Sequence, residues 1–291
     1  MDQYAIVTDT SANLPSELVR DYNIHVIPFS YYIGGQEFEE NTGFNGRRYY
    51  EKMRAGEDVT TSQINPAKYC AYLEPILESG ENVLFIGLSS GVSGSFGSAQ
   101  IAAAMLRESY PERSICVIDS LGASLGEGLL VLQAAKLRAM GATLRVVQHQ
   151  LLSMRNRIYQ VLTVDNLKYL RKSGRLSNSA AAVGTVLQIK PLLKGNENGQ
   201  IVALTKLRGR RRSIEALAEK YEELAEHPED QIVGIAHADC PEDAAELKAL
   251  IMKNHPPKSI ITVCFEPVTG AHVGPGTLAL FFQGAEGVRT K

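Results

Sequence analysis

The sequence predicts an α/β protein of two domains. We expect an N-terminal α/β domain with a parallel sheet over residues 1–158 and a C-terminal α+β domain with a mixed or antiparallel sheet over residues 159–291. The length of 291 residues is sufficient for two domains. The first half alternates short apolar runs with amphipathic runs, which is the pattern of parallel strands joined by crossover helices. The second half contains the turn pair Asn198-Gly199, which is typical of a hairpin between antiparallel strands.

In the N-terminal domain, strands are expected where apolar residues run together, and helices where apolar residues recur every three or four positions. A helix is expected to begin at Pro66, with Asn65 as its N-cap. The other expected helices cover residues 14–23, 45–56, 96–110, 125–141 and 143–157. The expected strands cover residues 4–10, 25–33, 83–88 and 114–120. Ligands of such sheets tend to bind beyond the carboxyl ends of the strands.

In the C-terminal domain, the same patterns predict a hairpin at residues 190–208 and two final strands that are antiparallel across a loop at residues 268–276. The expected strands outside the hairpin cover residues 159–164, 230–238, 259–268 and 277–284. The expected helices cover residues 166–173, 178–189, 210–227 and 241–255.

Composition and charge exclude several classes of protein. The formal net charge of −2 supplies no general attraction to nucleic acid, so no nucleic-acid partner is expected. The N-terminus lacks a signal peptide, and the longest apolar runs are too short to span a bilayer. The cysteines are scattered without a CxxC pair, which indicates free thiols in a reducing compartment. We therefore expect a cytoplasmic protein, and a monomer by default.

Three polar segments are expected to be loops, each at the end of an expected strand or the start of an expected helix. They are residues 60–63 (TTSQ), residues 89–95 (SSGVSGS) and residues 270–276 (GAHVGPG), the last of which carries His272. Helix N-termini present free N–H groups to an anion, hydroxyls add donors, and glycines let a ligand approach the backbone. Neutral hydroxyls and a histidine suit one carboxylate better than a polyanion. These segments therefore predict a site for a carboxylate.

Each of these segments has a simpler structural interpretation. Ser93 could cap the following helix, Thr61 and Ser62 could be ordinary turn residues, and His272 could be an exposed loop histidine. The other histidines show no metal-ligand spacing with one another or with the cysteines, so no metal is expected.

An acyl hydrolase or acyltransferase that uses Ser93 and His272 is the alternative function. The nucleophile-elbow pattern Gly-x-Ser-x-Gly begins at Gly91 but ends at Ser95 instead of glycine. Asp9 and Asp119 end strands and could either orient such a Ser/His cluster or cap the helices that follow. The chain contains neither of the common glycine-rich nucleotide-binding motifs.

Basic residues gather at positions 171–175 and 206–212. Most such runs are solvated faces, but on a chain of net charge −2 they favour a local positive surface for an acidic partner. Arg175 lies in an expected turn, where it could also interact with the last carbonyls of the preceding helix.

Taken in order, a set of segments resembles the DegV family, the fatty-acid-binding proteins that include the FakB subunits of bacterial fatty acid kinase. The segments are VTDT, TTSQ, LSSGVSGSFGSA, VIDS, VDNLKYLRKSGRLS, IKPLL, KLRGRRRS and AHVGPG. The resemblance covers nearly the whole chain. VTDT departs from the more usual Thr-Asp-Ser, and KSGR departs from Gly-Gly-Arg, and both changes are conservative.

The resemblance implies a DegV-type fold that holds a long-chain fatty acid, such as palmitate, between the two domains. The acyl chain would lie in an apolar tunnel, with its carboxylate at Thr61, Ser93 and His272 and with Ser62 and Gly94 as neighbours. FakB-type members are not enzymes and need no cofactor besides the bound acid. They present its carboxyl group to a separate ATP-dependent kinase subunit, which makes an acyl phosphate. The kinase-docking arginines of the family would correspond to Arg175 and Arg208.

Overall fold

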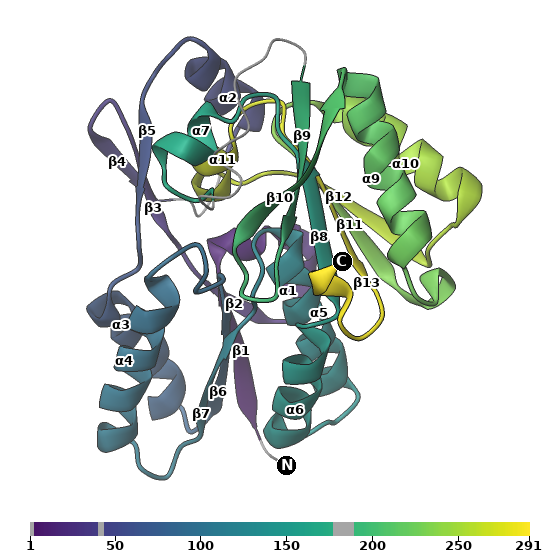
Figure 1. The fold of residues 1–291 in the computed structure, drawn as a ribbon. Helices are drawn as coiled ribbons and strands as arrows, with labels where there is room; N and C mark the ends of the chain where they lie inside the picture. The colour runs from purple at the N-terminus through teal and green to yellow at the C-terminus, as the bar shows by residue number, and fades with distance from the viewer. Residues whose placement is uncertain (1–2, 40–43, 177–188) are drawn as a thin grey trace.

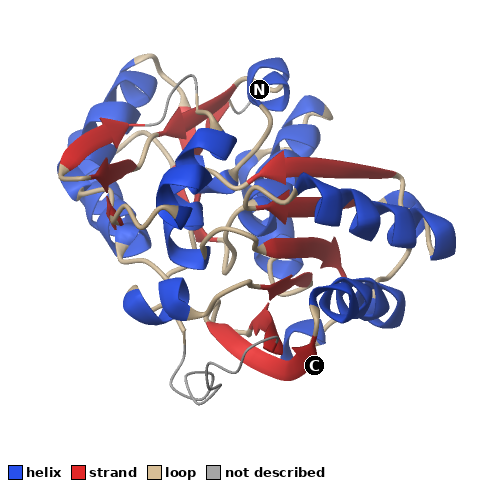
Figure 2. Cartoon of the chain, turned by 90° about the horizontal axis from the view of Figure 1, so that it is seen from above, coloured by secondary structure: helices blue, strands red, loops and turns tan. Residues whose placement is uncertain are grey.

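The structure is a computed structural model that describes residues 3–39, 44–176 and 189–291 (Figure 1). Three sheets organise these residues. One is parallel, one is a small antiparallel sheet, and one is mixed, and helices flank the two larger sheets (Figures 1 and 2). The expected α/β fold with a parallel sheet and a mixed sheet is therefore confirmed. The helix expected at residues 178–189 lies almost entirely outside the described residues.

The sheet with the strand order β2-β1-β6-β7 is parallel, as the alternating pattern predicts. Its strands are β1 (Tyr4–Asp9), β2 (Ile24–Ile27), β6 (Asn82–Gly87) and β7 (Ile115–Asp119). Helices α3 (Pro66–Glu78) and α4 (Ser95–Ser109) cover one face. Helices α1 (Ser16–Asp21), α5 (Leu125–Ala139) and α6 (Leu144–Met154) cover the other face.

The side-chain alternation of β1 shows why residues 4–7 are all apolar. Ala5 and Val7 join the core under α3 and α4, whereas Tyr4 and Ile6 join the core under α5 and α6. Because helices cover both faces of the sheet, side chains that point to either face are buried and must be apolar or have their polar groups hydrogen-bonded. The expected cap of α3 is also present, since the side chain of Asn65 accepts a hydrogen bond from Lys68 N at 2.9 Å.

A small antiparallel sheet in the N-terminal half was not predicted. It has the order β4-β3-β5 and consists of β3 (Ser30–Ile33), β4 (Gln36–Glu39) and β5 (Val59–Ser62), and α2 (Gly46–Arg54) lies between β4 and β5 in the chain. The single strand expected at residues 25–33 is wrong, because the chain leaves the parallel sheet after Ile27 and enters this one at Ser30. The expected loop at residues 60–63 is also wrong up to Ser62, because β5 pairs with β3 there.

The mixed sheet has the order β10-β9-β8-β13-β11-β12. Its strands are β8 (Ile158–Thr163), β9 (Ile189–Gly195), β10 (Ile201–Arg208), β11 (Ile232–His237), β12 (Ser259–Cys264) and β13 (Leu278–Gln283). The expected hairpin is present as β9 and β10, which pair antiparallel. Helices α9 (Arg210–Leu224) and α10 (Pro241–Asn254) cover the outer face of this sheet (Figure 1).

The end of the chain differs from expectation in two ways. Strands β12 and β13 run in opposite directions, as expected, but they are not neighbours, because β11 lies between them, parallel to β12 and antiparallel to β13. The expected loop at residues 268–276 is largely helix α11 (Pro267–Val273). Pro267 occupies the first turn of α11, and Glu266 caps it by accepting hydrogen bonds from Val268 N and Thr269 N.

Helix α5 lies between the parallel sheet and the mixed sheet. Leu130 and Val131 pack in the core of the parallel sheet, while Leu125 and Leu129 pack against the inner face of the mixed sheet. The remaining short elements are α7 (Lys168–Lys172) and the 3-10 helices η1 (Thr10–Ala12), η2 (Pro228–Asp230) and η3 (Val288–Thr290). Within the described residues, no helix combines the length and the apolar character needed to cross a membrane.

Candidate functional site

A cavity of about 340 Å³ lies between the elements of the two halves. Its lining comes from β5, the loops after β6 and β7, β8, the segment after α7, the β9–β10 hairpin, α11 and β13. All of the residues predicted to bind the ligand line it, namely Thr61, Ser62, Ser93, Gly94 and His272. Apolar side chains form much of the remaining lining, including Phe29, Leu88, Leu162, Phe265, Val268 and Phe281. Mostly apolar walls with a few grouped polar side chains are typical of a small-molecule site.

The cavity lies beyond the carboxyl ends of the parallel strands. In the order β2-β1-β6-β7, the chain adds β2 on one side of β1 and then β6 and β7 on the other side, so the strand order reverses between β1 and β6. Ligands of parallel sheets bind in the crevice at such a point. Asp119, at the end of β7, shapes this edge by accepting hydrogen bonds from Ser90 N at 3.2 Å and Leu121 N at 3.0 Å. Neither of the two roles considered for Asp119 is found among its described contacts: it bonds Ser90 rather than Ser93 or His272, and the N-cap of α5 is Ser124.

His272 and Thr61 are brought together from distant parts of the chain. His272 lies in the last turn of α11, not in a loop, and its Nε2 is 2.8 Å from Thr61 Oγ1 on β5. Burial, helped by the nearby charge of Arg175, lowers the pKa of His272 from 6.5 to about 4. The imidazole is therefore neutral at physiological pH. Its Nδ1 is buried and has no hydrogen-bond partner among the described residues, so a carboxylate oxygen would satisfy it.

The described contacts of Ser93 are not those of a catalytic nucleophile. Its Oγ accepts a hydrogen bond from Ser95 N at 3.2 Å, at the start of α4. The described residues contain no hydrogen bond between Ser93 and His272, whose Nε2 contacts Thr61 instead. Activation of a serine requires a base within hydrogen-bond reach, and the described contacts do not provide that arrangement.

Gly94, the neighbour of Ser93, lies against the end of the Gln63 side chain. A Cβ at Gly94 would lie 2.3 Å from Oε1 of Gln63, the residue that follows β5. That atom is the far end of a flexible side chain, so a larger residue at position 94 would require Gln63 to change its rotamer rather than the loop to move.

Buried carboxyl groups hold the elements that carry the site. Asp9 caps η1 by accepting from Ser11 N, and it also accepts a hydrogen bond from Leu88 N at 3.2 Å, where the serine loop begins. Glu266 caps α11, which carries His272. Burial raises the pKa of Asp9 to about 6 and that of Glu266 to about 7. Of the two roles considered for Asp9, the structure shows the capping role.

Thr61, Arg175 and His272 separate the cavity from an outer cleft of about 500 Å³. These three residues line both spaces, and the outer cleft is also lined by Lys168 and Lys172. The end of the cavity with these polar residues is thus the end next to the outer cleft.

The two predicted docking arginines occupy different environments. Arg175 is half-buried in the cavity wall, whereas Arg208 is exposed at the end of β10 and does not line the cavity. Much of the predicted positive surface is neutralised by ion pairs. These join Lys172 to Asp58, Arg210 to Asp243, Arg211 to Glu215, and Arg212 to Glu219.

The cavity also contains residues that sequence reasoning missed. Gln160 on β8 accepts a hydrogen bond from Ala123 N at 3.2 Å and donates one to Leu121 O at 3.0 Å, so it ties β8 to the loop after β7. An isolated glutamine in a strand gives no sequence indication of such a role. Phe265 and Phe281 were also unrecognised, because a residue that lines an apolar cavity cannot be distinguished by pattern from one that fills a core.

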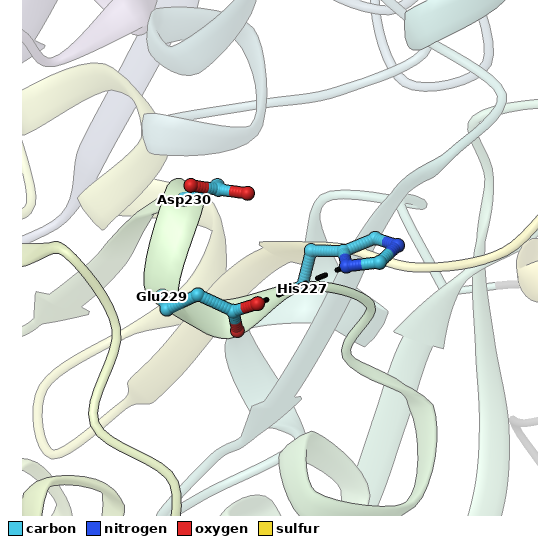
Figure 3. Close-up of side chains that lie close together, drawn as sticks. All are labelled: His227, Glu229 and Asp230. Atoms are coloured by element: carbon cyan, nitrogen blue, oxygen red, sulfur yellow. Dashed lines mark ion pairs between the residues drawn. The ribbon is translucent and has the colours of Figure 1, made fainter.

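A separate cluster of possible metal ligands lies on the surface. His227 precedes η2, and Glu229 and Asp230 belong to it. All three side chains are exposed (Figure 3). His227 Nδ1 is 3.8 Å from Glu229 Oε1. Exposed groups of this kind commonly occur without a metal, and this cluster lies apart from the cavity described above, none of whose lining residues belongs to it.

Comparison with known proteins adds independent findings. Residues 3–284 match the sequence profile described as an uncharacterised protein of the DegV family. The chain is 35% identical over 286 residues to a DegV domain-containing protein of Clostridium perfringens, a match that covers 98% of each protein.

Two solved structures share the fold. One is a DegV family protein from Thermus thermophilus described as fatty acid binding, with a TM-score of 0.89, 26% identity, and coverage of 97% of this chain and 100% of that one. The other is DegV from Bacillus subtilis, described as a fatty acid binding protein, with a TM-score of 0.86, 29% identity, and coverage of 98% and 100%. The resemblance found in the sequence is confirmed, and this chain belongs to the DegV family.

Proposed function

We propose that this protein binds one long-chain fatty acid in the cavity between its two halves. Thr61, Ser93 and His272 hold the carboxylate, Ser62 and Gly94 lie beside it, and the acyl chain occupies the apolar part. The observation that carries the proposal is that one cavity joins these polar residues to an apolar lining. The fatty acid binding described for the similar structures from Thermus thermophilus and Bacillus subtilis supports it.

Physical chemistry accounts for both ends of the ligand. Each buried CH₂ of an acyl chain contributes roughly 0.8 kcal/mol, which for palmitate is sufficient for retention through purification. At the other end, a buried carboxylate must be hydrogen-bonded, or its pKa rises until it takes up a proton. The Ser93 hydroxyl and the Nδ1–H of a neutral imidazole, whose Nε2 accepts from Thr61, supply donors without the charge that would favour a polyanion.

The first experiment is to denature the purified protein and to analyse its organic extract by mass spectrometry. We expect close to one long-chain fatty acid per chain. A folded protein that carries no lipid, and that takes up neither added palmitate nor added oleate, would contradict the proposal.

We further propose that the bound acid is presented to an ATP-dependent kinase subunit, which converts it to an acyl phosphate. Two observations support this: the polar end of the cavity faces the outer cleft, and Arg208 is exposed and available to a partner. Arg208→Ala should keep its fatty acid and lose acyl phosphate formation when mixed with a fatty acid kinase catalytic subunit and ATP. Equal rates for this variant and the unaltered protein would contradict a docking role for Arg208.

A further inference from the structure

Arg289 in η3 is a buried charge that lies outside the cavity. Only 2% of its surface is exposed, although arginine is among the residue types that are least often buried. Burial lowers the pKa of Arg289 to about 10, so the guanidinium still carries its charge at neutral pH. Within the described residues it makes no ion pair, and its hydrogen-bond partners are all backbone carbonyl oxygens. Because burial of a charge is costly unless hydrogen bonds replace its water, these carbonyls indicate what Arg289 does.

The guanidinium of Arg289 connects three segments that are distant in the sequence. Its Nε donates to Asn196 O at 3.0 Å, in the turn of the β9–β10 hairpin. Its Nη1 donates to Arg155 O at 3.0 Å and to Ile158 O at 3.4 Å, where β8 begins. Its Nη2 donates to Leu121 O, in the loop after β7. One side chain therefore joins the hairpin, the start of β8 and the loop after β7.

Two of these segments form a wall of the ligand cavity. The loop after β7 contributes residues 121–124, and the hairpin contributes Gly195, Gly199 and Ile201. None of these residues lines the outer cleft, so the wall belongs to the part of the cavity that the cleft does not reach. Arg289 does not line the cavity, but a Cβ at Gly195 would lie 3.3 Å from its Nη2. The guanidinium therefore lies directly behind the wall.

The loop after β7 has a strained backbone that needs support. Leu121 has a φ of 54° and Ser124 a φ of 51°, values that residues other than glycine rarely adopt. Such residues keep their conformation only where the surrounding structure holds them. The carbonyl oxygen of Leu121 accepts hydrogen bonds from both Gln160 and Arg289. Without the bond from Arg289, we expect the loop to relax and this wall of the cavity to move.

Lys194 holds the same segment in the reverse direction. From β9, its buried Nζ donates to Arg289 O at 2.8 Å and to Lys291 O. Tyr159 on β8 adds a hydrogen bond to Lys291 O at 3.2 Å. The hairpin therefore donates to the segment that carries Arg289 and accepts from it, which fixes the position of the guanidinium.

We propose that Arg289 is a positioning residue that holds the cavity closed around the acyl chain by fixing the loop after β7 to the β9–β10 hairpin. This inference rests on the proposed fatty acid site and adds to it a control of ligand release. Thr61, Ser93 and His272 recognise the carboxylate, whereas Arg289 sets how long the acid stays bound. When the wall moves away, the acyl chain loses packing contacts along its length and leaves faster.

The test is to load the protein with ¹³C-labelled palmitate, add an excess of unlabelled palmitate and follow the exchange by native mass spectrometry. In Arg289→Met the labelled acid should leave roughly tenfold faster or more, the factor that corresponds to loss of one hydrogen bond to a charged group. Hydrogen exchange of the peptide that contains residues 120–124 should also be faster in this variant.

Arg138→Met is the matched control. Arg138 on α5 is also a half-buried arginine that donates to backbone carbonyls, those of Tyr4, Tyr22 and Asn23. Tyr4 begins β1, so these bonds lie at the amino end of the parallel sheet, whereas the cavity lies beyond the carboxyl ends. Arg138→Met should lower the free energy of unfolding but leave the release rate and the exchange of residues 120–124 unchanged. Equal release rates in the two variants would overturn the proposal.

A second variant keeps the proposal testable if Arg289→Met does not fold. Lys194→Met weakens the attachment of η3 to β9 but retains the guanidinium, and it should also speed the release of palmitate. A folded Lys194→Met protein that releases palmitate at the unaltered rate would then overturn the role of Arg289.

Failure of this inference is distinguishable from failure of the proposed function. If the protein binds labelled palmitate and Arg289→Met releases it at the unaltered rate, only the role of Arg289 is wrong. If the folded, unaltered protein takes up neither labelled palmitate nor labelled oleate, the proposed function itself is contradicted.

Discussion

The hydrogen bond between Thr61 and His272 joins residues that are 211 positions apart in the sequence. Both residues were predicted to bind a carboxylate, but their contact and its consequence come from the structure. Burial makes His272 a neutral hydrogen-bonding group. It therefore suits the orientation of a carboxylate through hydrogen bonds rather than through charge.

The alternation of β5 provides a test of the head-group assignment at neighbouring threonines. Thr61 lines the cavity and Thr60 is exposed. Thr61→Val removes the hydroxyl that donates to His272 Nε2 and so keeps the imidazole proton on Nδ1 for the carboxylate, a contact to a charged group worth about 1.5–3 kcal/mol, and should weaken palmitate binding roughly tenfold to hundredfold. Thr60→Val should bind palmitate normally. Competition with a fluorescent fatty acid measures both variants, and normal binding by Thr61→Val would remove Thr61 from the site.

The lowered pKa of His272 predicts a pH dependence of stability with a defined sign. The folded protein keeps this imidazole neutral down to about pH 4, whereas the unfolded chain takes up a proton near pH 6.5. Protonation therefore favours the unfolded state between these values. The contribution of His272 is complete above pH 6.5 and is lost as the pH falls to 4.

Urea unfolding of the lipid-free protein and of His272→Gln at several pH values checks this. Between pH 6.5 and pH 4, the unfolding free energy of the unaltered protein should fall by roughly 3 kcal/mol relative to that of His272→Gln. Taking the difference removes the opposite contributions of Asp9 and Glu266, whose pKa values are raised by burial. A difference that is independent of pH would contradict the neutral, buried imidazole.

At the scale of elements, the cavity depends on a close contact between the loop after β6 and the tip of the β9–β10 hairpin. Ser89 Oγ donates to Gly199 O at 3.0 Å. A Cβ at Gly91 would lie 2.5 Å from the carbonyl oxygen of Asn198, which is backbone and cannot move alone. The Asn198-Gly199 turn thus contacts the serine-rich loop besides reversing the chain.

Replacement of two glycines near the site by alanine should change the stability of the protein in opposite directions. Gly91→Ala forces the hairpin tip away and should cost roughly 1–3 kcal/mol of stability, with weaker fatty acid retention. Gly97→Ala, in α4 where the space for a Cβ is open, should gain roughly 0.5–1 kcal/mol from helix propensity. Urea unfolding of the two variants measures this. Similar stabilities for the two would show that the tip is not in tight contact with the loop.

The elements that the sequence failed to predict share one physical cause. Residues 59–62 form β5 because β3 is available as a partner, and residues 267–273 form α11 because Glu266 and Pro267 start a helix within a glycine-containing segment. Short segments have weak local preferences, so a tertiary partner or a cap decides their conformation. The long segments 66–78 and 210–224, whose periodicity is clear, were predicted correctly as helices.

At the scale of the whole molecule, the two halves of the chain share their cores. Tyr50 on α2 donates to Phe265 O at 3.0 Å, and Tyr49 donates to Pro267 O at 2.6 Å, so the N-terminal half holds the segment that leads into α11. Helix α5 contributes to the cores of both larger sheets. Neither sheet keeps both of its faces buried if the other unfolds.

This sharing predicts one cooperative unfolding transition for the whole chain. The protein has no tryptophan and 12 tyrosines, so tyrosine fluorescence can be compared with far-ultraviolet circular dichroism during urea unfolding. Both signals should change with the same midpoint, because loss of α5 exposes apolar surface of both sheets. Two separated midpoints would show that the halves unfold independently.

By itself the sequence determined the types of the long elements, the parallel and mixed sheets, and the membership of polar residues such as Thr61, Ser93 and His272 in a candidate site. Those properties depend on local patterns and on residue chemistry. The tertiary structure alone decided that β5 and α11 carry the site, that His272 is neutral and that Arg175 lines the cavity. Each of those depends on burial and on contacts between distant residues, and a linear pattern contains neither distance nor solvent exposure.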